Sequence, residues 1–337
     1  MPATPLGKPV EIALDQQLCI DATSDDGDGN YLLHTMTLQG QPGRAFRFFQ
    51  IRNGVATDTG NHAFGDDNSS YSIDSQPSGF DRITTHLSSM ATFFDSTGHV
   101  LANQALQDSY DSPSFRNVVP AGGINELTQQ RTAAEGTVMT LVRIDKAGQR
   151  QPDATVNLGG RFPLLMATAV SGNVLVLAGT GSSGPNDIRA EGRWFSAAGA
   201  PLTDWFLFEE HLYGRGLNAQ LLFDGIGLRG DGDFEFVFPD GQARADKPAA
   251  WLQERSFTNF ALVRRGMAYA AYGGPHCSGG LEVLARSGKS CGCAAVPDMG
   301  ASFPGNNASI GRDGSLIVRT QPTQTQCRFQ VYPQLLR

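Results

Sequence analysis

The stretch Leu141-Val-Arg-Ile-Asp-Lys-Ala-Gly-Gln-Arg150 is written as a strand, a tight turn and a return strand. A short apolar run ends at Ile144, an aspartate follows it, and Gly148 stands four residues after Ile144. Asp followed by Gly favours a turn, because Asp bonds to its own backbone and Gly adopts positive φ without steric cost. The segment therefore predicts a β-hairpin.

The same pattern recurs along the chain at similar intervals. The last apolar residues before the recurring turns are Ile51, Phe94, Ile144, Phe195, Phe238 and Leu284. The steps between them are 43, 50, 51, 43 and 46 residues, and one more step reaches the final apolar run at Phe329 and Val331. A second marker, a recurring phenylalanine, has the same period at Phe115, Phe162, Phe257 and Phe303. Seven units of roughly 47 residues therefore fill the chain, and periods of this size indicate solenoids, arrays or propellers.

The content of one unit decides between these architectures. The unit that begins at Phe162 predicts four strands, at residues 164–170, 174–178, 188–195 and 201–208. Four antiparallel strands per unit are typical of a propeller blade. Helical repeats are excluded, because no stretch of the chain shows sustained 3.6-residue periodicity and β-branched and aromatic runs dominate.

The expected fold is therefore all-β: a seven-bladed β-propeller of four-stranded antiparallel blades, in a single domain over residues 1–337. The blades are expected to end near residues 59, 106, 158, 208, 250, 296 and 337. The last unit contains only three strands, so residues 8–17 are expected to complete the last blade and close the ring. In architecture, over nearly its whole length, the chain resembles the broad superfamily of bacterial seven-bladed β-propellers, without pointing to a specific family.

Composition restricts the classes of function. The net charge is -7 and the acidic residues are scattered, which argues against binding to nucleic acid. No apolar run is long enough to span a bilayer. The start of the chain lacks the basic and apolar regions of a signal peptide, so any such peptide would precede this sequence. A Gly-rich, Lys-poor chain with four cysteines in its last quarter favours an exported monomer with disulfides, located outside the cell, in the periplasm or at the cell surface.

The cysteines suggest two bridges. Cys19 follows the N-terminal strand and would lie near Cys327 if that strand completed the last blade; the alternative is two unrelated buried thiols. Cys277 is expected to pair with Cys291 or Cys293, because it lies just beyond the hairpin that carries them. A zinc site is the second choice there, since the spacing matches no standard zinc pattern.

Candidate ligand residues lie in the segments that do not repeat. Asp25 and Asp28 belong to a Gly-rich acidic turn that suits Ca²⁺ by residue type, although a solvated turn is the favoured alternative and no other cofactor is expected. The other ligand candidates occur singly or in pairs along the connections between units: His62, Tyr110, Arg161, Tyr272 and His276.

The densest polar and aromatic patch is residues 209–215. It contains Glu209, Glu210, His211, Tyr213 and Arg215. These groups are suited to general acid–base chemistry, and equally to holding a sugar or a peptide.

Three functions follow as hypotheses. The first is an exported or cell-surface module that binds a protein or carbohydrate without catalysis, because the connecting segments differ from unit to unit. The second is a hydrolase or lyase acting on carbohydrate or peptide, with Glu209, Glu210, His211 and Tyr213 as catalytic candidates. The third is a structural component of a surface assembly.

Overall fold

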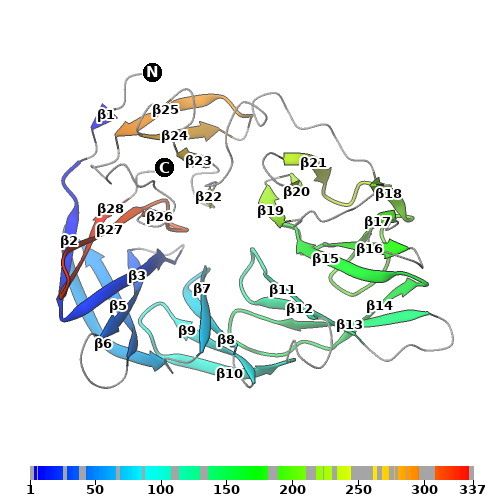
Figure 1. The fold of residues 1–337 in the computed structure, drawn as a ribbon, viewed down its shortest axis with the longest axis horizontal. Coiled ribbons are helices and arrows are strands. Elements are labelled where there is room, and N and C mark those ends of the chain that lie inside the picture. Colours follow the sequence, from blue (N-terminus) through cyan, green and yellow to red (C-terminus); the bar gives the residue numbers. More distant parts are fainter. Residues whose placement is uncertain are drawn as a thin grey trace. The chain divides into compact units, whose positions relative to one another are not determined.

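The fold is taken from a computed structural model of the chain. It describes the following residues: 4–5, 7–25, 29–37, 43–65, 69–85, 88–107, 114–129, 136–180, 189–209, 218–222, 224–229, 234–243, 261–263, 268–272, 277, 280–285, 287–295 and 308–333. Within these ranges the regular structure is β-strand and no helix is present (Figure 1). The described part of the chain therefore also contains no helix that is long and apolar enough to cross a membrane.

The recurring turn has the predicted geometry. Its glycines have positive φ, with values of 89° at Gly98, 76° at Gly148, 79° at Gly199 and 80° at Gly288. Each of these glycines donates its backbone N–H to the carbonyl oxygen three residues earlier, as Gly148 does to Asp145 at 2.9 Å. The side chain of Asp145 adds hydrogen bonds from the backbone N–H groups of Ala147 and Gln149, both at 2.9 Å. The Asp and the Gly are thus there for turn geometry, as the sequence predicts.

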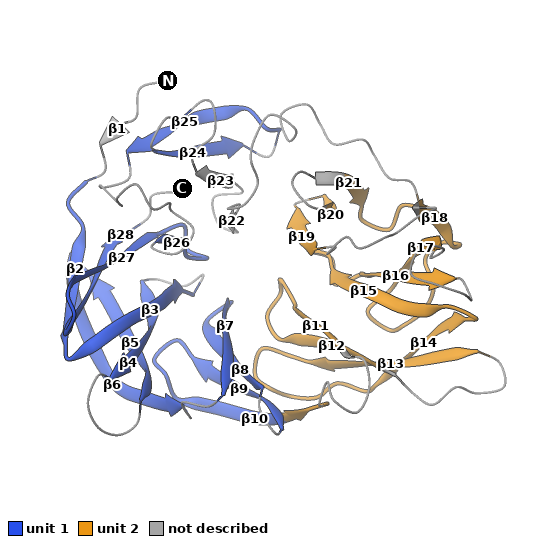
Figure 2. Ribbon diagram, viewed as in Figure 1, with its two compact units in different colours: residues 1–104, 254–337 blue, residues 105–253 orange. Residues whose placement is uncertain are grey.

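The chain divides into two compact units, and the division falls within strand β10 (Figure 2). Unit 1 comprises residues 1–104 and 254–337. Its first sheet consists of β3 (Gln17–Ser24), β4 (Asn30–Thr37), β5 (Arg44–Arg52) and β6 (Val55–Gly65). Its second sheet consists of β7 (Ser70–Gln76), β8 (Gly79–Thr85), β9 (Ser89–Asp95) and β10 (Val100–Leu106). Its other strands are β22 (Ala261–Val263), β23 (Ala268–Tyr272), β24 (Gly280–Ala285), β25 (Ser290–Ala295), β26 (Ala308–Ile310), β27 (Leu316–Thr323) and β28 (Gln326–Tyr332).

Unit 2 comprises residues 105–253 and contains three further sheets. The first consists of β11 (Ser114–Val118), β12 (Ile124–Gln129), β13 (Thr137–Ile144) and β14 (Ala154–Gly159). The second consists of β15 (Phe162–Thr168), β16 (Val174–Thr180), β17 (Arg189–Phe195) and β18 (Phe206–Glu209). The third consists of β19 (Asn218–Leu222), β20 (Gly225–Arg229) and β21 (Phe234–Pro239). In all three sheets the strands follow each other in chain order and pair antiparallel.

Each unit contains a sheet that buries both of its faces. In unit 1, Phe46 and Phe48 of β5 pack towards Phe80 and Phe94 of the β7–β10 sheet, while Phe49 packs on the opposite face. In unit 2, β17 sends Phe195 into one core and Trp194 into another. The first strands of successive sheets approach each other, β26 to β3 to β7 in unit 1 and β11 to β15 to β19 in unit 2. Four-stranded sheets stacked face to face in this way are typical of propeller blades.

The N-terminal segment joins the C-terminal strands. Strand β2 (Val10–Asp15) pairs antiparallel with β28, with Val10 opposite Val331, in a sheet ordered β2-β28-β27-β26. The disulfide between Cys19 and Cys327 is present and ties β3 to β28. Strand β1 (Thr4–Pro5) adds a parallel pair to β25.

Two expectations about strand limits are wrong. The fourth strand of the unit that begins at Phe162 starts at Phe206, and only an isolated bridge between Phe195 and Pro201 marks the expected start. The first sheet does not end near residue 59, because β6 continues to Gly65. A bulge at Thr59–Asn61, where Gly60 has a φ of 80°, absorbs the polar residues that suggested a loop.

Candidate functional site

Most of the predicted ligand residues lie outside the described residues. They are Asp28, Tyr110, Glu210, His211, Tyr213, Arg215 and His276. Glu209 ends β18 and Tyr272 ends β23, and only their backbone positions are described. The candidates whose side chains are described are His62, Arg161 and Asp25, together with the cysteines.

His62 lies on strand β6 and pairs with an aspartate of the same strand. Its Nε2 lies 2.9 Å from Oδ1 of Asp58. Asp66 and Asp67, which follow β6 in the sequence, lie outside the described residues. Because β6 is the last strand of its sheet, this pair is on an outer strand and not in a connection between sheets.

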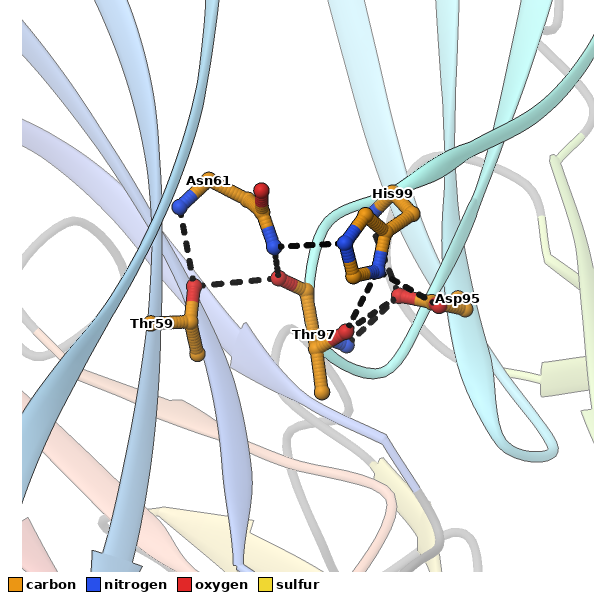
Figure 3. Close-up of polar contacts among 5 residues, drawn as sticks. All are labelled: Thr59, Asn61, Asp95, Thr97 and His99. Carbon is orange, nitrogen blue, oxygen red and sulfur yellow. Dashed lines mark hydrogen bonds and ion pairs between the residues drawn. The ribbon is translucent and has the colours of Figure 1, made fainter.

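Next to this pair, the β6 bulge contacts the turn between β9 and β10 (Figure 3). The hydroxyl of Thr59 and the side-chain amide of Asn61 both donate to the backbone carbonyl of Thr97, at 3.0 and 2.9 Å. Asn61 Nδ2 also donates to Nε2 of His99 at 3.4 Å, while Nδ1 of His99 lies 3.1 Å from Asp95. The network therefore joins two neighbouring sheets of unit 1.

The threonine, histidine and aspartate of this turn do not form a catalytic relay. In such a relay the hydroxyl and the carboxylate occupy opposite nitrogens of the imidazole. Here the hydroxyl of Thr97 and the carboxylate of Asp95 both lie at Nδ1 of His99, and Asn61 occupies Nε2. Burial acts to raise the pKa of Asp95, but hydrogen bonds from Thr97 and His99 outweigh it and hold that pKa below its ordinary value. Its carboxylate therefore serves to stabilise the turn.

Asp25 is fully buried and has structural partners. Its carboxylate accepts hydrogen bonds from Nδ2 of Asn30 at 3.1 Å and from the hydroxyl of Ser96 in the β9–β10 turn. Among the described residues no three His, Cys, Asp or Glu side chains are grouped so as to hold a metal ion. Asp28 is outside this set, so calcium at this turn stays a prediction.

The second disulfide joins Cys277 to Cys293, one of the two pairings expected at the end of the β24–β25 hairpin. Cys291 is a free, exposed thiol. Two disulfides are typical of proteins from an oxidising compartment.

Arg161 belongs to a compact group of charged and aromatic side chains in unit 2. A tight turn between β14 and β15 positions it, with its backbone N–H donating to the carbonyl of Leu158 at 3.3 Å. Its Nε lies 2.5 Å from Oε2 of Glu191, and its guanidinium carbon lies 4.4 Å from the centroid of Trp205. Such cation–π contacts contribute about 0.5–2 kcal/mol.

Strand β17 supplies the rest of the group. Its residues alternate, so Trp194 is buried on one face while Glu191 and Arg193 share the other. Arg193 lies 5.6 Å from the centroid of Trp205 and donates its Nε to the carbonyl of Thr203 at 2.8 Å. Two guanidinium groups therefore lie close to one tryptophan ring.

This group borders exposed apolar side chains. Leu207 lies directly opposite Glu191 on β18 and is 44% exposed, and Phe162, which follows Arg161, is 38% exposed. We call Arg161, Arg189, Glu191, Arg193, Trp205 and Leu207 the Trp205 surface. Sequence reasoning selected only Arg161 from it. The alternating charges of Arg189, Glu191 and Arg193 were the available signal, because a strand places alternate residues on one face.

Unit 1 contains a second unusual group, a pair of carboxyl groups in cross-strand register. Asp74 of β7 lies directly opposite Asp81 of β8. Asp81 is fully buried, and among the described residues neither of its carboxyl oxygens has a hydrogen-bond partner. Burial raises the pKa of Asp81 and the neighbouring Asp74 raises it further, against the opposing charge of Arg312. The pair therefore keeps a proton to higher pH than an ordinary carboxyl group.

Comparison with known proteins bears on the fold. No protein-family model matches the chain, and no curated protein matches its sequence. A prolyl endopeptidase structure matches 95% of this chain at 11% identity with a TM-score of 0.51, and prolyl oligopeptidase B from Galerina marginata matches 96% at 11% identity with a TM-score of 0.49. The WD40 domain of Pan2 from Neurospora crassa matches 98% at 9% identity, over 98% of its own length, with a TM-score of 0.47.

This chain spans 50% and 52% of the two peptidase chains. At 11% identity the likeness to the prolyl endopeptidase concerns the fold alone. Together with the stacked four-stranded antiparallel sheets, it supports a β-propeller fold.

Proposed function

We propose that this chain is a β-propeller of seven four-stranded blades, closed into a ring by its N-terminal strand, that acts as a binding module without catalysis outside the cytosol. The described residues form seven sheets, and β2 shares a sheet with the last three strands, which supports the closed arrangement. The two disulfides support an exported or cell-surface location.

The Trp205 surface carries the functional part of the proposal. Tryptophan and arginine dominate the binding energy of protein interfaces, where a few anchors are surrounded by apolar contacts. Here one tryptophan, two arginines within 6 Å of its ring and an exposed leucine lie together on unit 2. Arg161 is already held by Glu191 and Trp205, so its ordering on binding costs little conformational entropy. This arrangement favours a protein or peptide partner.

Peptide and glycan arrays test this proposal. The wild-type chain is compared with Trp205→Ala and with Leu207→Ser, which changes an exposed side chain and should leave unit 2 folded. Leu101→Ser, at 48% exposed on β10, is the matched control. We expect a set of peptides to bind the wild type and the control, and not to bind either variant of the Trp205 surface. Binding that survives both variants, or an array without any bound peptide, would refute the proposal.

A further inference from the structure

The Trp205 surface is positively charged although the chain as a whole is negative. The guanidinium groups of Arg161 and Arg189 lie beside the carboxylate of Glu191, and that of Arg193 lies beside the ring of Trp205. These four charged side chains sum to +2, or +1 with the exposed Asp204 that precedes Trp205, against -7 for the whole chain. An excess of positive charge at an aromatic surface attracts negatively charged partners.

The single carboxylate is already used. Oε2 of Glu191 lies 2.5 Å from Arg161, and its Oε1 lies 3.6 Å from Nε of Arg189. Glu191 is only 13% exposed, whereas Arg189 is 55% exposed. Among the described residues no carboxylate pairs with Arg193, whose Nε donates to the carbonyl of Thr203. Within the described residues, the outer nitrogens of Arg189 and Arg193 are therefore left for an external acceptor.

We propose that the Trp205 surface binds an acidic segment of a partner protein, with carboxylates on Arg189 and Arg193 and an apolar side chain on Leu207. This inference rests on the proposed function and adds the chemistry of the partner. Guanidinium groups bind carboxylates through two parallel hydrogen bonds, which gives such pairs directional specificity. The neighbouring Leu207 selects for a partner that is apolar beside its acidic residues, since a purely acidic chain would leave that side chain uncovered.

The test uses three short labelled peptides that share their leucines and differ only at the intervening positions, which are Glu, Gln or Lys. Fluorescence anisotropy with the full chain should give the tightest binding for the Glu peptide, with weakening as salt is added. Arg193→Gln should weaken binding of the Glu peptide by about tenfold or more, as expected when a charged hydrogen-bond partner is removed. Arg189→Glu should weaken it at least as much, because it reverses a charge.

Arg150→Glu is the matched control, because Arg150 is 50% exposed, lies in the same unit and pairs with Asp153, which is not a member of the Trp205 surface. Equal affinity for the Glu and Gln peptides, or an equal loss in Arg189→Glu and Arg150→Glu, would overturn the acidic partner. In that case binding of the Gln peptide that depends on Trp205 would still support the proposed function. An acidic polysaccharide that binds where the Glu peptide does not would also overturn this inference.

Discussion

Substituting Gly98 by alanine should destabilise unit 1 through two separate effects. Gly98 has a φ of 89°, and a side chain in this region costs roughly 1–2 kcal/mol. A Cβ at this position would also overlap the ring of Phe48, with the ring carbon Cγ only 2.5 Å away. Phe48 is fully buried between the two sheets, and overpacking of such a core costs about 1–3 kcal/mol. The expected loss in free energy of unfolding is therefore about 2–5 kcal/mol.

A second turn glycine of unit 1 separates these effects. Gly54 has a φ of 77°, but a Cβ there would meet nothing within 4 Å. Gly54→Ala should therefore lose only the backbone contribution of roughly 1–2 kcal/mol. Both variants are compared with the wild type by urea unfolding followed by circular dichroism. Tryptophan fluorescence serves as a second probe, because all three tryptophans (Trp194, Trp205 and Trp251) belong to unit 2.

An equal loss in Gly98→Ala and Gly54→Ala would refute the packing argument. The tryptophan signal of unit 2 and the binding of peptides at the Trp205 surface should be unchanged in folded Gly98→Ala. Loss of peptide binding at unchanged stability would show that the turn belongs to the binding site and not to the scaffold.

The remaining predictions concern protons and thiols in unit 1. Asp81→Asn should raise the free energy of unfolding at neutral pH by about 1–3 kcal/mol, because it removes a buried charge without a hydrogen-bond partner. The pKa of Asp81 is raised, so the stability that its protonated form contributes is present below the ordinary carboxyl pKa and is lost as pH rises through the raised value. Urea unfolding from about pH 4 to pH 8 should therefore show that the free energy of unfolding depends less on pH in the variant than in the wild type. Thiol titration of the denatured, unreduced chain should find one thiol, that of Cys291, and five after reduction. Replacing Cys19 and Cys327 together by serine should cost about 2–5 kcal/mol, measured by the same urea unfolding, since a native disulfide is lost.

The sequence predicts the elements whose causes are local. A turn such as Asp145–Gly148 is determined by the φ of its glycine and by hydrogen bonds that its own aspartate accepts, so its residue types predict it. The end of the strand before such a turn follows from its apolar run, as at Phe195, whereas the start of the strand after the Gly199 turn does not. The Cys19–Cys327 bridge could also be suggested from the sequence, because the three C-terminal strands lack a fourth and the N-terminal strand precedes Cys19.

Features with distant causes could not be predicted. The polar, glycine-containing sequence at Thr59–Asn61 predicts the end of a unit, yet these residues form a bulge whose partner is the carbonyl of Thr97 in another sheet. The stacking of Arg161 on Trp205 joins residues that are 44 positions apart, from the two ends of one sheet. The raised pKa of Asp81 depends on its register opposite Asp74, which a single strand does not reveal.

The turn glycines also show why function is to be sought in the Trp205 surface. A Cβ added at Gly98 would meet the ring of Phe48 in the preceding sheet, and one added at Gly199 would lie 2.7 Å from the carbonyl oxygen of Thr155 in its own preceding sheet. The repeat therefore encodes the approach of one sheet to the next as well as the hairpin. The turn glycines are thus required by the fold.

The charged residues of β17 obey no such repeat. Counted back from the turn, Arg193 corresponds to Thr92 in one sheet and to Val142 in another. A scaffold requirement would recur wherever the turn recurs, as the glycine does. Arg193 lies beside Trp205 and pairs with no carboxylate of the described residues, as the proposed binding of a partner by this one sheet requires.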